Sequence, residues 1–312
     1  MQEIDQGMLV VAALGGNALL RRGSPMTAAA QRANVREAAT ALAGIVRAGH
    51  RLIVTHGNGP QIGLLALQQD RTATGGVYPL DVLGAETEGM IGYLIEQELE
   101  NALGHSVPVA TLLTQVEVDP DDPAFTRPKK FIGPLYGEDE ARALGAALGW
   151  SIAQDGDHWR RVVASPEPKR IPDIGVLRIL VERGVVVICT GGGGIPVAER
   201  PDGALQGVEA VIDKDRASAL LAAELGADAL LLLTDVDAVY RDWGGPDEAP
   251  IRRMAPEEAV TLDLPDGSMG PKAEAACRFT LAGGRIAAIG ALADAPTILR
   301  GEAGTMISQD PA

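Results

Sequence analysis

Two lysines give the first indication of chemistry in a chain whose overall charge is strongly negative. The sequence contains 27 Lys and Arg residues against 42 Asp and Glu, a formal net charge of −15. Such a field repels phosphate groups, so an anionic substrate would need cations of its own. Lys214 lies between Asp213 and Asp215 at the start of a predicted helix, and Lys272 lies in the first turn of another. Both could stabilise a bound phosphate, although a solvated, charged helix cap is the commoner fate of such a triplet.

Three glycine-rich turns each follow a predicted strand and could complete an anion site. Glycine lets backbone N–H groups come close to an anion, and an asparagine amide adds a further donor. The turns comprise Gly15, Gly16 and Asn17; His56, Gly57, Asn58 and Gly59; and Gly191, Gly192, Gly193 and Gly194. Because parallel strands end at one edge of a sheet, the first two turns would converge there, and the position of the third turn at a strand end also favours anion binding. Singly, each could also be an ordinary turn or a flexible loop, and His56 is expected to bond within its own turn rather than act as a base.

Further motifs narrow the class of protein. The segment Thr234–Asp237 ends another predicted strand, where its polar side chains suit the edge or ribose of a nucleotide. The GxGxxG fingerprint and the P-loop lysine motif are absent from the sequence, and so is the protein-kinase catalytic loop. Cys189 and Cys277 lie far apart without the spacing of metal ligands, so neither a disulfide framework nor a zinc site is expected. No metal-ligating residues are therefore predicted.

The elements that must position these residues follow a regular alternation. Short apolar runs alternate with longer helical stretches, which is typical of a mostly parallel sheet with helices on both faces. The predicted strands cover 9–14, 51–55, 109–114, 185–190, 229–233 and 285–290, and the predicted helices cover 27–48, 84–103, 174–183, 216–225 and 273–281. Two stretches interrupt the alternation. Residues 119–172 are proline-rich and are predicted to form a small subdomain or flap, without long helices over much of it; residues 242–270 are predicted to be an acidic loop.

Composition excludes several partners. Hydrophobic residues make up 46% and charged residues 22% of the chain, which supports a packed core rather than disorder. Aromatic residues make up only 3%, too few for the stacking on which single-stranded nucleic-acid binding depends. The first residues are acidic where a signal peptide is basic, and no apolar run approaches the roughly 20 residues of a membrane helix. We therefore expect a cytoplasmic protein with neither a nucleic-acid nor a membrane partner.

Several motifs occur together and in order, and through them the chain resembles the carbamate kinases of the amino acid kinase family over roughly residues 8–307. They are ALGGNALL (13–20), THGNGPQIGLLALQ (55–68), SPEPKRI (165–171), GGGGIPV (191–197), GVEAVIDKD (207–215), TDVDAVY (234–240) and GSMGPKAEAACRF (267–279). The resemblance implies an α/β fold, an open αβα sandwich with a central, mostly parallel sheet of about eight strands, plus a small protruding subdomain at about 119–165. It further implies an amino-terminal lobe, 1–212, that binds the phosphoryl acceptor and a carboxy-terminal lobe, 213–312, that binds ATP or ADP.

The implied reaction is reversible phosphoryl transfer, in which ATP and carbamate give ADP and carbamoyl phosphate. Mg²⁺ would accompany the nucleotide, the chain would be a homodimer, and the physiological direction would be ATP synthesis in arginine catabolism. By motif, the catalytic residues would be Lys130, Lys214, Asp215 and Lys272; the substrate site would be lined by Gly15, Gly16, Asn17, Gly57, Asn58, Gly59, Gly192 and Gly193; and the nucleotide would contact Thr234, Asp235, Asp237, Tyr240, Met269, Gly270 and Lys272.

Two departures from the family pattern bear on these roles. The segment Pro128-Lys129-Lys130-Phe131 stands where the family usually has Pro-Thr-Lys-Pro, which leaves open whether Lys129 or Lys130 reaches the phosphate. Ala13 stands where acetylglutamate kinases and their relatives have a lysine, which favours carbamate as the acceptor. The alternatives are a phosphotransferase for another small acid and a non-catalytic nucleotide or metabolite sensor. The sensor would be expected to lack one of the phosphate lysines.

Overall fold

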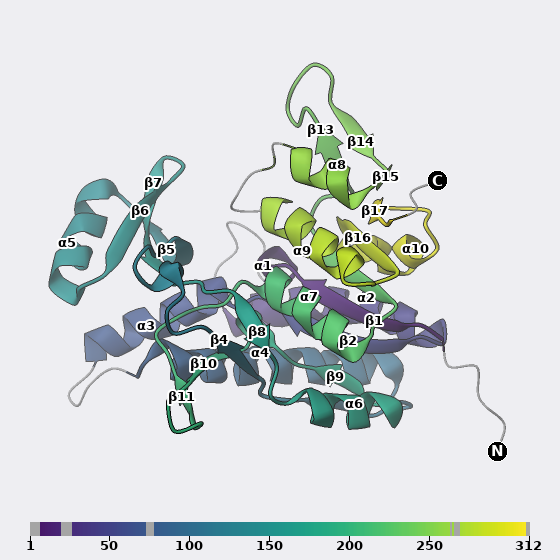
Figure 1. The fold of residues 1–312 in the computed structure, drawn as a ribbon, viewed down its shortest axis with the longest axis horizontal. Helices are drawn as coiled ribbons and strands as arrows, with labels where there is room; N and C mark the ends of the chain where they lie inside the picture. The colour runs from purple at the N-terminus through teal and green to yellow at the C-terminus, as the bar shows by residue number, and fades with distance from the viewer. Residues whose placement is uncertain (1–6, 20–26, 73–77, 263, 265–268, 310–312) are drawn as a thin grey trace.

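An eight-stranded sheet forms the centre of the computed structural model, which describes residues 7–19, 27–72, 78–262, 264 and 269–309 (Figure 1). β17 runs antiparallel to β16, and the other described neighbours in this sheet are parallel. In spatial order the strands are β15 (Arg253–Met254), β17 (Thr305–Ile307), β16 (Ile286–Ala291), β12 (Ala229–Thr234), β1 (Leu9–Leu14), β2 (Arg51–His56), β9 (Val186–Ile188) and β3 (Val109–Thr111). The predicted mostly parallel sheet is confirmed, although β3 is shorter than the predicted strand 109–114.

The central strands are apolar throughout because helices cover both of their faces. All six residues of β1 are buried, and alternate side chains enter two different cores. Leu9, Val11 and Ala13 belong to one core, whereas Val10 and Leu14 belong to the other. A strand buried on both faces reads as a continuous apolar run, as this one does.

Two layers of helices complete the sandwich (Figure 1). Apolar side chains of the helices on one face pack into the core that contains Val10, and those on the other face pack into the core that contains Val11. The first layer comprises α1 (Gly16–Leu19), α2 (Ala28–Arg47), α4 (Leu80–Leu103) and α10 (Ala295–Leu299), with η3 (Leu292–Asp294); the second comprises α6 (Ile174–Glu182), α7 (Lys214–Leu225), α8 (Pro256–Thr261) and α9 (Met269–Leu281). None of the helices within the described ranges is long and apolar enough to cross a membrane.

A small unit projects from the sandwich, at the left of Figure 1. It is a three-stranded antiparallel sheet of β5 (Lys130–Tyr136), β7 (His158–Val163) and β6 (Ser151–Asp155), with the helix α5 (Glu138–Leu148) beside it. We call residues 130–163 the protruding unit. It confirms the predicted subdomain, but it is narrower than the stretch 119–172.

The flanks of that stretch belong to a second, four-stranded sheet. The order of its strands is β11 (Leu205–Gly207), β10 (Ile195–Glu199), β4 (Gln115–Val118) and β8 (Pro168–Arg170), and η1 (Pro123–Phe125) follows β4. The protruding unit also rests on α3 (Gly59–Thr72), a helix that the strand and helix assignments from sequence did not include. The contact is close: a Cβ on Gly63 would lie 2.0 Å from the Cα of Gly133, so this position requires glycine. Gly133 favours glycine for a different reason, its positive φ of 75°.

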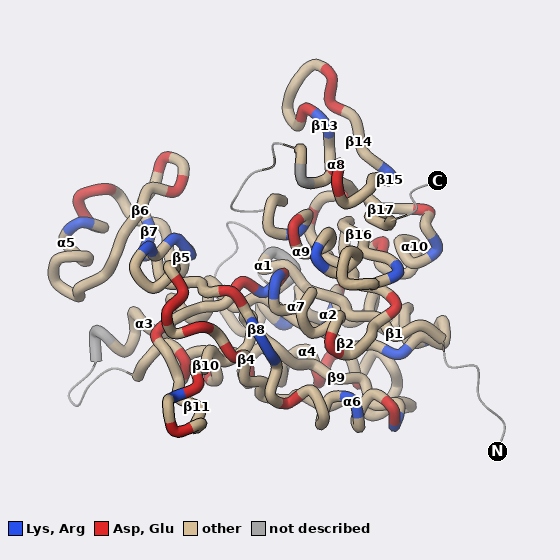
Figure 2. Tube along the Cα trace, in the orientation of Figure 1, with Lys and Arg blue, Asp and Glu red and all other residues tan. Residues whose placement is uncertain are grey.

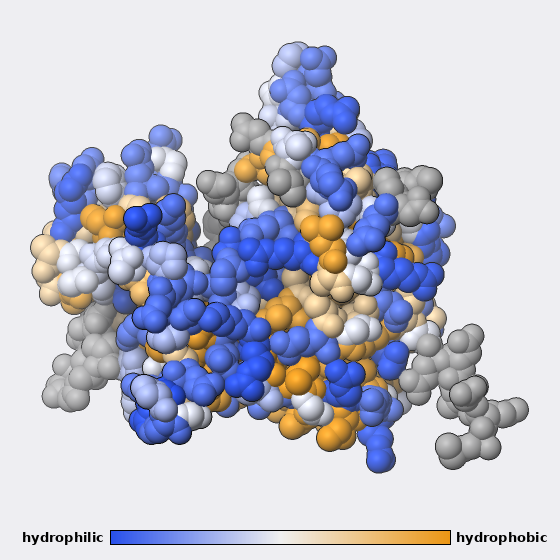
Figure 3. All heavy atoms as spheres, viewed as in Figure 1, coloured by the Kyte–Doolittle hydropathy of each residue, from blue (hydrophilic) through white to orange (hydrophobic). Residues whose placement is uncertain are grey.

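The predicted acidic loop at 242–270 is partly wrong. It contains a hairpin strand, β14 (Ala249–Ile251), which pairs with β13 (Val239–Arg241), and it contains β15 and α8 as well. The hairpin forms the upper tip of the molecule in Figure 1. On the face shown in Figure 3, hydrophilic residues surround the junction between the protruding unit and the sandwich, and apolar side chains gather lower down, over α6, where Val176 and Ile179 are exposed.

Candidate active site

The first two glycine turns meet at the carboxyl ends of β1 and β2, as the parallel pairing requires. Leu14 and His56, the last residues of these strands, are directly paired. A Cβ added to Gly57 would lie 3.6 Å from the backbone nitrogen of Gly16 and 3.4 Å from Cδ of Lys214. The structure therefore brings two turns and one of the predicted lysines together at one point of the sheet edge.

Two of the expected amide donors are already engaged. The N–H of Gly15 donates to the carbonyl of Leu233 at 3.0 Å, and the N–H of Gly57 donates to that of Leu14 at 3.1 Å. These two amides thus have partners within the sheet edge, and both glycines keep the turns free of side chains. Their contact with an anion stays a prediction. Gly16 and Gly59 begin α1 and α3, whose first N–H groups carry the positive end of a helix dipole, and Asn17 lies in α1.

Lys214, Asp215 and Lys272 form a buried cluster at the start of α7 and α9. The ammonium of Lys214 contacts Oδ1 of Asp215, and Nζ of Lys272 lies 3.2 Å from Oδ2 of the same carboxylate. The three side chains are only 11%, 5% and 10% exposed, in sequence order. A single carboxylate thus fixes the spacing of two ammonium groups that come from different helices.

Burial and charge oppose one another within this cluster. Burial alone would raise the pKa of Asp215, but the neighbouring ammonium groups of Lys214 and Lys272 outweigh it and hold that pKa below its usual value. For Lys214, burial and then the charge of Lys272 lower the pKa, while Asp215 opposes the change. Asp215 is therefore the buried countercharge that lies between the two lysines.

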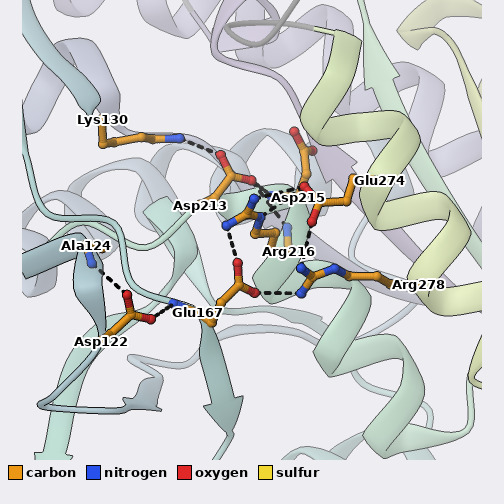
Figure 4. Close-up of polar contacts among 9 residues, drawn as sticks. All are labelled: Asp122, Ala124, Lys130, Glu167, Asp213, Asp215, Arg216, Glu274 and Arg278. Atoms are coloured by element: carbon orange, nitrogen blue, oxygen red, sulfur yellow. Dashed lines mark hydrogen bonds and ion pairs between the residues drawn. The ribbon is translucent and has the colours of Figure 1, made fainter. Parts of the chain in front are cut away.

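Lys130 reaches the same place from the protruding unit (Figure 4). Its Nζ lies 2.6 Å from Oδ2 of Asp213, the residue that precedes α7. The other oxygen, Oδ1, accepts the N–H groups of Asp215 at 2.9 Å and Arg216 at 3.3 Å, so Asp213 caps the helix. Burial would raise the pKa of Asp213, but the charge of Lys130 and its hydrogen bond, then Lys214, drive it far below the usual range.

The third turn, η2 (Gly191–Gly193), lies against the second. Thr190, Gly192, Gly193 and Gly194 have positive φ angles of 53°, 67°, 97° and 86°, whereas Gly191 does not. A Cβ on Gly192 would lie 2.1 Å from Nδ2 of Asn58, so the asparagine amide packs directly on this turn. The N–H of Gly193 is used within the turn, where it donates to the carbonyl of Thr190.

Two residues that hold these turns were not singled out from the sequence, Thr87 and Glu88 of α4. Nδ2 of Asn58 donates to the hydroxyl of Thr87 at 2.9 Å. Glu88 accepts the N–H of Gly191 at 2.7 Å and that of Thr114 at 3.2 Å. The detectable signal is a polar pair on the core-facing stripe of an otherwise apolar helix face, since Leu83 and Ile91 occupy the same buried stripe.

His56 is unsuited to proton transfer. Its side chain is fully buried, and Nδ1 lies 3.1 Å from the carbonyl oxygen of Gly57, which confirms the expected bond within its own turn. Burial lowers the pKa of His56 to about 4, so the imidazole is neutral at physiological pH. We assign it a structural role beneath the turns.

The residues predicted to contact a nucleotide lie beside the lysine cluster and extend away from it. Thr234 ends β12, and a Cβ on Gly15 would lie 3.8 Å from its Cα, while Met269 and Gly270 form the first turn of α9. Thr234 donates to Asp235 at 3.1 Å. Further out, the hydroxyl of Tyr240 donates to Asp237 at 2.7 Å, and the Tyr240 ring lies edge-on to Trp243. Asp237 and Tyr240 thus bond to each other rather than to the lysine cluster.

The charge environment makes the cluster distinctive. Figure 2 shows acidic residues on many parts of the chain, including the end of β10, the turn between β10 and β11 and the turn between β13 and β14. Together with Lys130 and Asp213, the cluster contains three lysines and two aspartates, one net positive charge, at a place where the helices α1, α3, α7 and α9 all begin. No group of three or more His, Cys, Asp or Glu side chains suited to a metal ion occurs among the described residues. The arrangement can therefore bind and stabilise a transferring anion through lysines and helix termini.

Comparison with known proteins agrees with this geometry. The model of the amino acid kinase family matches residues 8–289. A carbamate kinase from Rhizobium meliloti (strain 1021) is 57% identical over 303 residues, covering 96% of this chain and 93% of the relative. A carbamate kinase from Escherichia coli (strain K12) is 52% identical over 299 residues, covering 96% and 99% of the two chains.

Solved structures give the same result. Carbamate kinase from Giardia lamblia bound to citric acid has a TM-score of 0.92 at 40% identity and covers 97% of this chain and 99% of its own. The same protein bound to AMP-PNP has a TM-score of 0.88 at 41% identity, with the same coverage. The likeness thus extends over the sandwich, the protruding unit and the lysine cluster.

Proposed function

The chain belongs to the amino acid kinase family, and from that membership we propose that it transfers a phosphoryl group reversibly between ATP and carbamate. The buried Lys214–Asp215–Lys272 cluster beside the glycine turns carries the proposal. The relatives from R. meliloti and E. coli are carbamate kinases over nearly their full lengths, so transfer to a different small acid is not favoured. The sensor alternative is also disfavoured, because Lys130, Lys214 and Lys272 are all present and gathered at one place.

The lysines act on charge rather than on protons. An oxygen of the carbamate anion attacks the γ-phosphorus of ATP, the bond to the β-phosphate oxygen breaks, and ADP leaves with the electron pair. The total charge is the same on both sides, so no general base is required, which agrees with the buried, neutral state of His56. Lys214 and Lys272 would neutralise the phosphoryl oxygens in flight, and positioning with charge stabilisation would supply most of the catalysis.

Lys130 would add a third positive charge to the phosphate site, from the protruding unit. It comes from the protruding unit and already points at Asp213, the N-cap of the helix that begins with Lys214 (Figure 4). Between the two candidates in the segment 128–131, Lys130 is the one with this contact, whereas Lys129 is exposed. A short movement of the Lys130 ammonium from Asp213 to a bound phosphate would let it stabilise the phosphoryl group as well.

Substrates would approach from two sides. The acceptor would lie over Gly15, Gly16, Asn17, Gly57 and Asn58, with the turn of Gly192 and Gly193 behind it. The nucleotide would lie along Thr234, Asp235, Asp237, Tyr240, Met269 and Gly270. This assigns the acceptor to residues 1–212 and ATP to residues 213–312, and the structure of the G. lamblia relative with AMP-PNP supports nucleotide binding in this fold.

Mg²⁺ would arrive with the nucleotide as part of the substrate. The carboxylates of the cluster are committed elsewhere, since Asp215 holds two lysines and Asp213 holds Lys130 and caps α7. Mg²⁺ commonly keeps several waters and binds through substrate phosphates with few protein ligands. Chelation with EDTA should abolish turnover, and added Mg²⁺ should restore it without a resident protein site.

We also propose a homodimer in the cytoplasm, with ATP synthesis during arginine catabolism as its task. Met90 and Tyr93 of α4 and the adjacent Leu113 are exposed by 37%, 54% and 50%. Leu113 lies beside Gly89 of the same helix, next to the edge strand β3, so these side chains form one apolar surface. Light scattering should give twice 32.4 kDa at micromolar concentration, and a monomer in both the native chain and Tyr93→Glu would contradict the dimer.

The direct test of the function uses the ATP-forming direction. Purified protein is incubated with ADP, Mg²⁺ and carbamoyl phosphate, and ATP is measured with luciferase; acetyl phosphate replaces carbamoyl phosphate in a parallel reaction. We expect ATP from carbamoyl phosphate and little from acetyl phosphate. Preference for acetyl phosphate would identify a different acceptor, and nucleotide binding without any ATP formation would identify the sensor.

A further inference from the structure

A ring of four charged side chains lies beside the lysine cluster and is not part of it (Figure 4). Arg216 of α7 and Arg278 of α9 alternate with Glu167 and Glu274. NH2 of Arg216 lies 2.9 Å from Glu274, Arg278 lies 2.6 Å from each glutamate, and NH1 of Arg216 contacts Glu167. Each carboxylate binds both arginines, so the ring is closed and electrically neutral.

Glu167 is the member of the ring that comes from the root of the protruding unit. It lies in the connection between β7, which ends at Val163, and β8, which begins at Pro168. The N–H of Glu167 donates to Oδ2 of Asp122 at 3.0 Å, and Oδ1 of Asp122 accepts the N–H of Ala124. The segments that enter and leave the protruding unit are therefore joined at this residue.

The ring lies within a few residues of all three lysines. Arg216 follows Lys214 by two residues on α7, and Glu274 follows Lys272 by two residues on α9. Lys130 is paired across the sheet with Val163, four residues before Glu167. A single carboxylate is thus linked to the two helices and to the strand that carry the cations.

We propose that Glu167 is a positioning residue that holds Lys130 of the protruding unit in register with Lys214 and Lys272. The inference rests on the proposed function, since it assigns the lysines to one reaction. Glu167 does not touch the lysines; it acts through Arg216 and Arg278. Without its carboxylate the two helices stay joined through Glu274, but the root of the protruding unit loses its ion pairs with them.

The expected effect is moderate because the ring is partly exposed. Its side chains are between 28% and 47% exposed, so solvent weakens each ion pair, although a closed network exceeds an isolated pair. A backbone bond from the N–H of Val211 to the carbonyl of Ala164, at 2.9 Å, continues to hold the start of the connection. We therefore expect Glu167→Gln to lower kcat about three- to tenfold with KM for ADP nearly unchanged.

The matched control is Glu138→Gln. Glu138 belongs to the same protruding unit and pairs with Arg142 at 2.7 Å within α5, but it has no link to α7 or α9. The same chemical change there should leave kcat within about twofold of the native value. Equal kcat values for Glu167→Gln and Glu138→Gln would overturn the proposal.

A mutant cycle with Lys130→Ala separates positioning from general damage. If Glu167 acts by placing Lys130, Glu167→Gln should reduce kcat by less than about twofold once Lys130 is absent. A full three- to tenfold reduction in the Lys130→Ala background would show that Glu167 acts by another route. Matching melting temperatures of Glu167→Gln and the native chain would show that the fold is retained.

Hydrogen exchange supplies a readout that does not depend on activity. Amides of β5 and of residues 164, 165 and 167 should exchange faster in Glu167→Gln than in Glu138→Gln, because only the first change releases the root of the protruding unit. Identical exchange in both variants would refute the inference even if the native protein made no ATP. An inactive native protein would contradict the proposed function, whereas an active one with unaltered Glu167→Gln would contradict this inference alone.

Discussion

Replacing Asp215 by asparagine tests whether one carboxylate organises the reacting lysines. The substitution keeps the size of the side chain but removes its charge, and it turns an amide NH2 group toward an ammonium. The net charge of the cluster formed by Lys130, Lys214, Lys272, Asp213 and Asp215 rises from +1 to +2. Because Asp215 opposes the effect of burial on the pKa of Lys214, that pKa should fall further in the variant.

The size of the effect follows from distance and burial. At the 3.2 Å between Nζ of Lys272 and Oδ2 of Asp215, the attraction is about 5 kcal/mol for an effective dielectric constant of about 20. Removing one partner of a buried pair typically costs about 3–5 kcal/mol, since the remaining charge is uncompensated. We expect the melting temperature to fall by about 10 °C and kcat/KM for ATP formation to fall by about 100-fold or more.

The pH dependence of stability independently tests whether Asp215 stabilises the fold as a charged carboxylate. The pKa of Asp215 is lower in the folded chain than its usual value of about 3.8, so the stability that it contributes is complete above about pH 4. That stability is lost as the pH falls from there through the folded-state pKa. Asp215→Asn should lack this part of the acid transition, and thermal melts between pH 7 and pH 2 would reveal the difference.

Asp213→Asn is the matched comparison, two residues away. Asparagine is a good N-cap, so this variant should keep α7 and weaken only the hold on Lys130. We expect a smaller loss of stability and activity than for Asp215→Asn, measured by the same melts and luciferase assay. Activity of Asp215→Asn within a few fold of the native value, or equal losses in the two variants, would refute the central role of Asp215.

Two further predictions concern Lys130 and the third glycine turn. Lys130→Ala should lower kcat strongly, by about 100-fold if the ammonium acts in the transition state, and Lys129→Ala only mildly; equal losses in steady-state assays would contradict the assignment of Lys130. Gly192→Ala should cripple activity because the new methyl group would collide with Asn58, whereas Gly226→Ala has a similar positive φ with open space around it and should cost stability alone; the two variants are compared by melting temperature and by kcat/KM, and equal kcat/KM values would remove Asn58 from the site.

Much of the fold could be predicted because the central strands are buried on both faces and are therefore continuous apolar runs in the sequence. The run Leu9–Leu14 is apolar at every position since both of its faces are covered, and β1 has the predicted bounds. The segment 242–270 was harder because a short hairpin such as β13–β14 is stabilised by few residues and has no long periodic pattern. The helix α3 begins in the glycine turn itself, so its first residues look like a loop.

The lysines of the site could be found because cations are rare in an acidic chain and motifs fix their places. The residues that hold these lysines in place could not be recognised from the sequence in this way. Glu167 is one glutamate among many, and only the folded chain shows that it meets arginines on α7 and α9. Gly15 and Gly57 illustrate a second limit: the sequence shows that their N–H groups could donate to an anion, but not that neighbouring strands already use them.

Glu88, which holds the third glycine turn in place and was not singled out from the sequence, gives a further prediction. It is fully buried, and burial raises its pKa to about 8 although it accepts two backbone N–H groups. The unfolded chain loses this proton near pH 4.5 while the folded chain retains it, so stability should decline between about pH 4.5 and pH 8, by about 4 kcal/mol at most.

Glu88→Gln does not titrate, and its amide cannot accept both N–H groups. It should therefore be less stable than the native chain at pH 5, and the difference should shrink by pH 8, where the native chain must bury a charge. Urea denaturation at the two pH values measures this change. Glu86→Gln, an exposed change two residues away on α4, is the control and should follow the native chain at both. A constant gap between Glu88→Gln and the native chain would show that Glu88 does not titrate in this range, and that its carboxylate is stabilised by the turn that it holds.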